Sequence, residues 1–546
     1  MIRRPPRSTL SSSSAASDVY KRQKNILFIM ADQLRWDYLS CYGHPYLKTP
    51  NIDKLAKEGL LFESAFVQSP ICGPSRASFY TGRTVFSHGA TLNQVPLPIG
   101  ELTIGDYLRK DNIKTAVVGK THMKPDKDGM ERLGLTKETD IGMIVSEPGF
   151  DPYERDDGLH PNNWVKNYST ALTYNKWLNS LGYEGDNPWE TWANSAEGPN
   201  GDLLSGWKLR NSNKQARIQE EHSETAYMTN RAIDFMNENK DDQWMLHLSF
   251  IKPHWPYIAP SPYHNMYSPN QFYEVVREDK ENQIQHEVYR AFTNAQVSKV
   301  FSKREVREAV ITGYMGLIKQ IDDNLGRLFE FMEQNKLFQN TMIVFTSDHG
   351  DYLGDHWLGE KELFHEQSVR VPLIIYDPSD NANSTRGQRE KKLVESIDLL
   401  PTFLEALNIS TSTHRLEGRS LLPIIRGTQL NDWRNSVFSE IDYGLHSARD
   451  ELELGPHEAR AFMIRTEKWK YIYYKGFSPQ LFNLEKDPNE FEDLGQNQNY
   501  EKIRTELKDL LLKRLINRKN LLTVDEKFVL KGQDIESEGG VMIGVW

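Results

Sequence analysis

Four short apolar runs, each followed directly by polar residues, constrain the fold of this chain most strongly. The runs have the length of β-strands and span residues 24–30, 114–119, 244–251 and 341–346. Buried parallel strands are near-continuously hydrophobic in this way, because helices cover both faces of their sheet. Ligands of open α/β sheets bind beyond the carboxyl ends of such strands. The pattern therefore predicts an α/β protein with a functional crevice at one edge of its sheet.

The polar residues after these runs are the first candidates for that crevice. Taken one at a time, each is an ordinary turn or surface residue, but clusters at the ends of several strands would converge if the strands are neighbours. Carboxylates beside lysine and arginine also fit a metal site next to an anion site. The candidates are Asp32, Gln33, Lys120, His122, His254, Asp348 and His349.

Residues 69–83 form the second informative stretch, which reads SPICGPSRASFYTGR and contains C-x-P-S-R from Cys72 to Arg76. Pro74 suits the first position of a helix, where its missing N–H is not needed. Cys72 would then lie at a helix N-terminus, where an anion is stabilised and a thiol ionises more easily. Arg76 adds a positive charge about one turn further on. A buried structural cysteine beside a helix start remains the alternative.

The motif C-x-P-S-R followed by A-S-x-x-T-G-R resembles the signature of the sulfatases, a branch of the alkaline phosphatase superfamily. The Gly-Lys-x-His at residues 119–122, the Pro-His-x-Pro at residues 253–256 and the spacing from Lys361 to Arg370 are similar to the same family. The longer segment 252–264 looks most like the phosphonate monoester hydrolase subgroup. The resemblance covers nearly the whole chain, from about residue 25 to about residue 517.

This resemblance implies a metal-dependent hydrolase of sulfate, phosphonate or phosphate esters. A formylglycine-generating enzyme would convert Cys72, and the hydrated aldehyde would attack a small anionic ester to form a covalent intermediate. His254 would donate a proton to the leaving oxygen. The implied catalytic residues are Cys72, Arg76, Lys120, His122, His254 and Lys361. The implied metal ligands are Asp32, Gln33, Cys72, Asp348 and His349.

Two departures from the common sulfatase pattern bear on the metal. Many sulfatases have Asp-Asp where this chain has Asp32-Gln33, and Asp-Asn where it has Asp348-His349. Fewer carboxylates and an added imidazole move the site away from an all-oxygen calcium site. Manganese, calcium and zinc stay open, with manganese or calcium favoured.

The overall organisation follows from the same reading. We expect a doubly wound mixed sheet sandwiched by helices, similar to alkaline phosphatase, over residues 24–434, with an insertion over the site at about 151–222. A smaller C-terminal α+β subdomain at 435–520 would contain an antiparallel sheet and a helix at 500–517, followed by a tail at 521–546. Residues 1–23 look like a translated sequencing adaptor and are excluded from the fold. Further helices are expected at residues 49–66, 102–109, 223–237, 313–334 and 397–407.

Composition and charge limit the kinds of binding partner and the cell compartment to be expected. The net charge of −10 argues against nucleic acid, and the two cysteines, Cys41 and Cys72, exclude a disulfide framework. No apolar run is long enough to span a membrane, and the absence of a signal-peptide core favours the cytoplasm. The tail could be an arm between subunits of a homo-oligomer.

Two other functions stay open. A phosphotransferase or mutase of the same superfamily would share the metal ligands but use threonine or serine, against which Cys72 counts. A catalytically inactive binding homologue would have lost Asp32, Cys72, Arg76 or Asp348, and all four are present.

Overall fold

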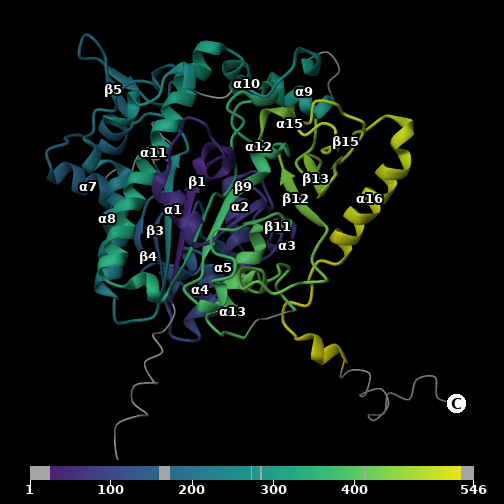
Figure 1. The fold of residues 1–546 in the computed structure, drawn as a ribbon, viewed down its shortest axis with the longest axis horizontal. Helices are drawn as coiled ribbons and strands as arrows, with labels where there is room; N and C mark the ends of the chain where they lie inside the picture. The colour runs from purple at the N-terminus through teal and green to yellow at the C-terminus, as the bar shows by residue number, and fades with distance from the viewer. Residues whose placement is uncertain (1–24, 159–171, 272–273, 283–285, 411–413, 531–546) are drawn as a thin grey trace, which may run out of the picture.

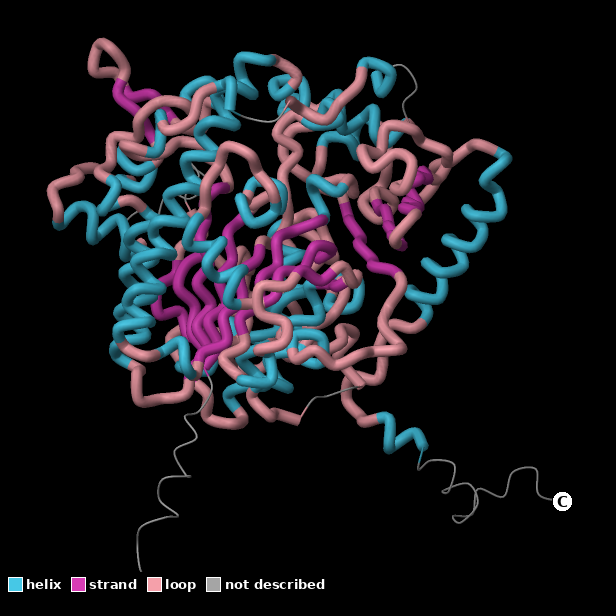
Figure 2. The backbone as a smooth tube through the Cα atoms, viewed as in Figure 1, coloured by secondary structure: helices cyan, strands magenta, loops and turns pink. Residues whose placement is uncertain are grey.

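A nine-stranded mixed sheet runs through the middle of the computed structural model, covered on both sides by helices (Figures 1 and 2). The structure describes residues 25–158, 172–271, 274–282, 286–410 and 414–530. The strands of this sheet are β1 (Asn25–Asp32), β2 (Leu60–Phe66), β3 (Lys114–Gly119), β4 (Asp151–Arg155), β7 (Trp244–Pro253), β8 (Thr341–Thr346), β9 (Arg370–Tyr376), β10 (Arg389–Glu390) and β11 (Val394–Glu395).

The sheet has the order β10-β2-β9-β8-β1-β7-β3-β4, with β11 also paired to β2. The strands β8, β1, β7, β3 and β4 run parallel, whereas β9 is antiparallel to both β8 and β2. The strand that carries the first apolar run, β1, lies inside the parallel part, between β8 and β7. The predicted doubly wound mixed sheet is therefore confirmed.

Both faces of the sheet are buried, as the continuous apolar runs of the strands indicate. Along β1, Phe28 and Met30 face one core and Leu27 and Ile29 face the other. This alternation follows from the two-residue period of a strand. The first core is covered by α2 (Cys72–Thr81), α4 (Ile104–Arg109) and α13 (Leu399–Ala406), and the second by α1 (Pro50–Glu58), α8 (Glu224–Glu238) and α11 (Arg304–Gln334).

Three element predictions need correction. The helix expected at 49–66 is α1 only, because Gly59 ends it and the remaining residues form β2. The helix expected at 313–334 begins nine residues earlier, at Arg304. The insertion expected from residue 151 starts later, because residues 151–155 form β4 and pair with β3 at the edge of the sheet.

Shorter elements complete the main body. The segment after β4 includes a small hairpin of β5 (Ser195–Glu197) and β6 (Leu203–Ser205). Further α-helices are α3 (Val85–His88), α5 (Lys127–Arg132), α6 (Asp140–Ser146), α7 (Thr173–Ser180), α9 (Glu287–Asn294), α10 (Gln296–Phe301), α12 (Glu366–Val369), α14 (Leu422–Ile425) and α15 (Ser447–Glu451).

A separate antiparallel sheet forms the C-terminal unit, as predicted. Its strands, in spatial and sequence order, are β12 (Ser436–Asp442), β13 (Arg460–Thr466), β14 (Trp469–Tyr474) and β15 (Gln480–Asn483). Helix α16 (Glu501–Ile516) lies on this sheet at the right of Figure 1 and buries Leu507 and Leu511 against it. The leader 1–23 and the end of the tail, 531–546, lie outside the described residues, and the predicted domain boundaries stay a prediction.

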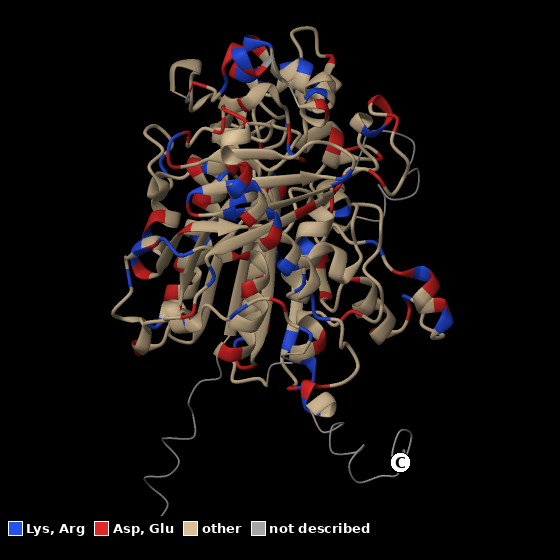
Figure 3. Cartoon of the chain, turned by 90° about the vertical axis from the view of Figure 1, so that its right-hand side faces the viewer, with Lys and Arg blue, Asp and Glu red and all other residues tan. Residues whose placement is uncertain are grey.

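Acidic and basic residues are interspersed along the chain (Figure 3). Within the described ranges, none of the helices combines the length and the apolar character that crossing a bilayer requires.

Candidate active site

Four strand ends meet at one edge of the central sheet. The strands β8, β1, β7 and β3 are neighbours and run parallel, so their carboxyl ends lie along the same edge. Open α/β sheets bind their ligands at this edge. The predicted site residues lie together at this edge, where contacts and charge interactions connect them. They are Asp32, Gln33, Cys72, Arg76, Lys120, His122, His254, Asp348, His349 and Lys361.

Helix α2 delivers Cys72 to this edge. The helix begins at Cys72, with Ile71 as its N-cap. Pro74 is therefore the third helical residue, whereas the sequence suggested that it would be the first. Proline is tolerated there because the first four N–H groups of a helix have no intrahelical acceptor. All ten residues of α2 are buried, and Cys72 lies at the positive end of the helix dipole.

Cys72 belongs to a cluster of four potential metal ligands. One ligand atom from each of Asp32, Cys72, Asp348 and His349 lies within 4.8 Å of the others. His349 Nε2 lies 3.0 Å from Cys72 Sγ, and His349 Nδ1 lies 2.9 Å from the Gly350 carbonyl oxygen. A carbonyl can only accept, so Nδ1 carries the hydrogen and Nε2 directs its lone pair at the cluster. These four groups can therefore hold one divalent cation.

Arg76 lies behind the two acidic ligands and is fully buried. Its Nε donates to Asp348 at 2.8 Å and its Nη2 donates to Asp32 at 3.1 Å. Its Nη1 donates to the carbonyl of Lys120 and to the hydroxyl of Ser249, both at 2.8 Å. All four of these hydrogen bonds go to groups of the protein, two of them to the acidic ligands. Arg76 therefore fixes the spacing of the two carboxylates.

Asp32 is ionised despite complete burial. Burial alone would raise the pKa of this carboxyl, but Lys120, His254 and Arg76 hold the pKa well below its ordinary value. The Lys120 ammonium lies 2.6 Å from Asp32 Oδ2. An ionised Asp32 is what a cation ligand requires.

The second lysine of the site contacts Cys72 directly. Lys361 Nζ lies 3.3 Å from Cys72 Sγ and donates to Gln33 Oε1 at 2.9 Å. Burial would lower the pKa of Lys361, but the nearby Cys72 and Glu360 raise it above its ordinary value. Lys361 therefore places a permanent positive charge beside residue 72.

The amide of Gln33 has a defined orientation. Its Nε2 donates to Asp351 Oδ2 at 2.5 Å and to the Tyr257 hydroxyl at 3.1 Å. The Tyr257 hydroxyl also donates to Asp351, at 2.6 Å. These contacts turn Gln33 Oε1 toward Lys361, whose ammonium also lies beside Cys72. Gln33 thus offers an oxygen, and not an NH₂ group, to a cation or its surroundings.

Two histidines at the site, His122 and His254, are uncharged at neutral pH. Burial and the charge of Lys120 lower the pKa of both, and the pKa of His254 falls well below its ordinary value. His254 Nδ1 lies 2.8 Å from the Trp255 carbonyl oxygen, so Nδ1 carries the hydrogen. The nearby Cys72 offsets part of this lowering of the His122 pKa. His254 must therefore gain a proton before it can act as an acid.

Sequence reasoning missed the residues that orient the site. Asp351 and Tyr257 lie in segments that the motifs already marked, two residues after His349 and three after His254, but no role was assigned to them. Ser249, which accepts from Arg76, lies inside an apolar strand. Proximity to a motif could have pointed to Asp351 and Tyr257, whereas nothing in the sequence distinguishes Ser249.

Comparisons with known proteins agree with this geometry. Residues 24–409 match the family model described as Sulfatase, and residues 354–517 match a model described as N-sulphoglucosamine sulphohydrolase, C-terminal. The multifunctional alkaline phosphatase superfamily protein PehA of Trinickia caryophylli is 31% identical over 500 residues, which cover 88% of this chain and 92% of that protein.

Two further relatives extend the similarity. An arylsulfatase of Clostridium perfringens is 29% identical over 94% of this chain and 98% of its own length. The crystal structure of the phosphonate monoester hydrolase of Agrobacterium radiobacter is similar with a TM-score of 0.78 at 26% identity, covering 90% of this chain and 96% of that chain. The match of the family model to most of the chain shows that this protein belongs to the sulfatase family of the alkaline phosphatase superfamily.

Proposed function

We propose that the site at the sheet edge hydrolyses sulfate esters or phosphonate and phosphate esters, with the attacking oxygen carried by residue 72. One observation carries this proposal: Cys72 Sγ is one of four potential metal-ligand atoms within 4.8 Å of one another, and it also lies 3.3 Å from the Lys361 ammonium. Such a site places a nucleophile between a cation and a positive charge that can hold a tetrahedral anion. As a member of the sulfatase family, the chain is a hydrolase of ester bonds.

A divalent metal fits the donor set. Asp32 and Asp348 would supply carboxylate oxygens, His349 an imidazole nitrogen and Gln33 an amide oxygen, next to residue 72. This mixture of oxygen and nitrogen suits manganese or calcium, with zinc as a third candidate. When bound, the metal would polarise the sulfur or phosphorus centre of the ester.

Residue 72 is proposed to become formylglycine through a formylglycine-generating enzyme. The hydrated aldehyde supplies an oxygen nucleophile and a second hydroxyl, whose deprotonation releases the anion again after transfer. The position at the start of α2 supports this role, since the helix dipole favours negative charge there. The family relationship supports the modification.

The remaining polar groups of the site have distinct roles in this proposal. Lys120, Lys361 and His122 surround the position next to residue 72 and would stabilise negative charge on the transferring group. His254 would donate the proton to the leaving oxygen. It is neutral without substrate, but an anion bound beside Lys120 adds negative charge that raises the pKa of the imidazole.

Between the two ester classes, we favour the phosphonate esters. The segment Pro253-His254-Trp255-Pro256 and the pairs Asp32-Gln33 and Asp348-His349 support this choice. The similarity to the phosphonate monoester hydrolase of Agrobacterium radiobacter supports it as well. The similarity to an arylsulfatase over 94% of this chain makes sulfate esters the second candidate.

The test uses protein produced together with a formylglycine-generating enzyme. The mass of the peptide that contains residue 72 should correspond to an aldehyde, and paired assays with an aryl phosphonate monoester and an aryl sulfate should show faster turnover of the phosphonate. Cys72→Ala should abolish turnover, whereas Cys41→Ser, at the other and half-buried cysteine, should leave it unchanged. An intact thiol at residue 72 in protein that turns over either ester would refute the proposed nucleophile.

A further inference from the structure

The loop between β8 and α12, which carries Lys361, is strained. Its non-glycine residues His356, Trp357, Glu360 and Glu362 have φ angles of 51°, 60°, 60° and 95°. Residues other than glycine rarely adopt such backbone conformations, which persist only where contacts with the surrounding structure hold them in place. The contacts that hold this loop therefore decide where the Lys361 ammonium lies.

A lysine from the C-terminal sheet provides one of these contacts. Lys470 of β14 is completely buried, and its Nζ donates to the Phe364 carbonyl at 2.7 Å. The same ammonium lies 2.6 Å from Glu490 Oε1 and 3.1 Å from Glu366 Oε1. One buried ammonium, which carries three donors, thus faces a backbone carbonyl and two carboxylates. We refer to Lys470, Glu366 and Glu490 as the brace.

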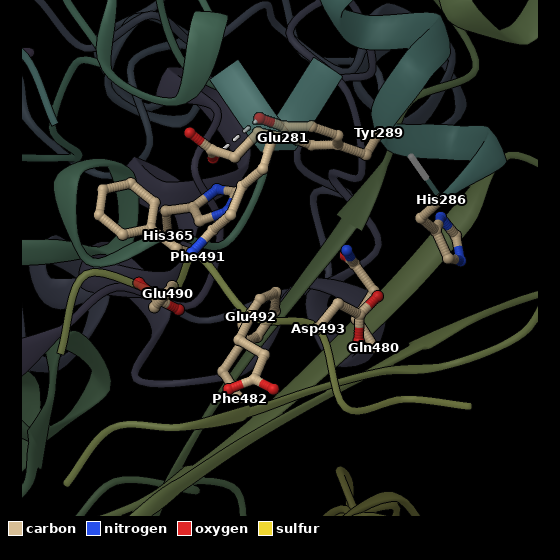
Figure 4. A pocket seen from close by; sticks show the side chains of 11 residues that line it. Glu281, His286, Tyr289, His365, Gln480, Phe482, Glu490, Phe491, Glu492 and Asp493 are labelled. Carbon is tan, nitrogen blue, oxygen red and sulfur yellow. Dashed lines mark hydrogen bonds between the residues drawn. The ribbon is translucent and has the colours of Figure 1, made fainter. Parts of the chain in front are cut away.

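The residues of the brace also contact one another and the backbone at the end of the loop. Glu490 Oε2 accepts from the backbone N–H of Glu366 at 2.9 Å, so the loop is held by its backbone at Phe364 and at Glu366. Glu490 and the loop residue His365 line a cavity of about 320 Å³ beside β15, where both are seen in Figure 4. None of the site residues named above lines this cavity.

We infer that Lys470 is a positioning residue for Lys361. Phe364 is three residues after Lys361, and three residues span at most about 11 Å, so a shift of the held carbonyl reaches Lys361 with little chain between them to absorb it. At the other end, Lys361 Nζ lies 3.3 Å from Cys72 Sγ. The C-terminal sheet thus completes the active site without touching substrate. The inference rests on the proposed role of Lys361 in hydrolysis.

A double-mutant cycle tests this inference. Lys470→Met keeps the aliphatic stem and removes the ammonium, and we expect kcat for the aryl ester to fall by about 10- to 100-fold with a smaller change in KM, since displacing a catalytic group by about 1 Å has costs of this size. In a Lys361→Ala background, the same change should alter kcat by less than about twofold, because no ammonium is left to position. A merely structural role would lower kcat by the same factor in both backgrounds, and that result would overturn the inference.

Two further variants separate positioning from misfolding. Lys470→Met combined with Glu490→Gln removes one charge of each sign, so the buried network stays balanced, and the cycle is repeated with this pair if the single variant does not fold. Lys468→Met is the matched control, because Lys468 precedes β14, has a side chain that is 59% exposed and pairs with Glu485 on the surface. Wild-type kcat in folded Lys470→Met would also overturn the inference. Failure of the proposed function appears separately, as wild-type protein that turns over neither ester.

Discussion

At the scale of single residues, the spacing of the two acidic ligands depends on Arg76. Its planar fork reaches Asp32, Asp348, the Lys120 carbonyl and Ser249 at the same time. Burying two carboxylates is costly unless each is paired and hydrogen-bonded, and the guanidinium supplies both kinds of contact. A lysine, with a single point of charge, cannot make four such contacts in these directions.

Arg76→Lys is therefore expected to weaken metal binding as well as catalysis. The two carboxylates would lose their common partner and their fixed spacing, and changes in groups that orient metal ligands typically cost about 10- to 100-fold in affinity or activity. The metal content of the purified variant, measured by mass spectrometry, should be below that of the wild-type protein, and kcat/KM should fall by about 10²-fold or more.

The matched control for this variant is Arg83→Lys. Arg83 is also buried, follows the same helix and pairs with Glu101 at 3.1 Å, but it lies at the end of α2 away from the cluster. This control should lose stability and keep its metal content. Equal metal content in the two variants would contradict the role given to Arg76.

The residue types of the site follow from the sequence, but their orientations do not. The polar residues after the strands converge as expected, because neighbouring parallel strands end at one edge. The sequence could not reveal that Arg76 donates to both carboxylates, or that Asp351 turns the Gln33 amide. Both facts depend on hydrogen bonds between residues far apart in the sequence, for which no local pattern exists.

At the scale of elements, the close approach of β3 and β7 places Lys120. Gly119 ends β3 with a φ of +103°, and a Cβ at this position would lie 2.0 Å from the Ser249 carbonyl oxygen. The next residue, Lys120, donates its backbone N–H to the same carbonyl at 3.0 Å. Only glycine therefore allows the ends of these two strands to meet next to Asp32.

Gly119→Ala is expected to destabilise the protein and to displace Lys120. The strained φ and the clash with the β7 backbone should together cost at least about 2 kcal/mol, which appears as a lower midpoint of thermal unfolding. The variant should also have a lower kcat, because Lys120 moves with the strand end. Gly100→Ala is the control, since a Cβ there meets nothing within 4 Å. An unchanged unfolding midpoint in Gly119→Ala would show that the strand ends can separate freely.

The elements themselves are predicted best where one pattern dominates. The apolar strands and the long stripe of α11 were recognised, whereas the first nine residues of α11 are too rich in charge to reveal the two buried valines among them, Val306 and Val310. Strand β2 was missed because its apolar residues continue the stripe of α1, although Gly59 separates the two. Strand β4 contains a proline and three charges, which an edge strand tolerates and a pattern search rejects.

At the scale of the whole molecule, ion pairs to buried carboxylates connect the C-terminal unit to the central body. Arg514 of α16 donates to Glu395 of β11 at 2.9 Å, across 119 residues of sequence. The change to short alternating strands near residue 435 predicted this unit, but not its attachment. Ion pairs between distant segments produce no periodic pattern in a sequence. The contacts that attach the C-terminal unit to the central body could therefore be identified only from the structure.

Buried histidines are a second property of the whole molecule. Burial is the main reason that the pKa falls to about 3 for His88 and His247 and to about 4 for His44 and His446. These four residues lie in different parts of the chain, and all of them are neutral in the folded protein at pH 5 to 7. In the unfolded chain they would titrate near the ordinary histidine pKa of about 6.5.

Stability is therefore expected to fall as the pH is lowered from about 6.5 toward 4. In this range the unfolded chain binds protons that the folded chain does not, and each such histidine lowers the free energy of unfolding by up to about 1.4 kcal/mol per pH unit. His247 offers a direct test, because it contacts the Tyr80 hydroxyl at 3.1 Å and the Phe28 carbonyl at 3.1 Å, two contacts that an amide could replace. His247→Gln should be less stable at pH 7 but should lose less stability between pH 7 and pH 5, measured by urea unfolding. If both proteins lose the same amount, His247 is already protonated when folded, and the neutral interior inferred here is wrong at this position.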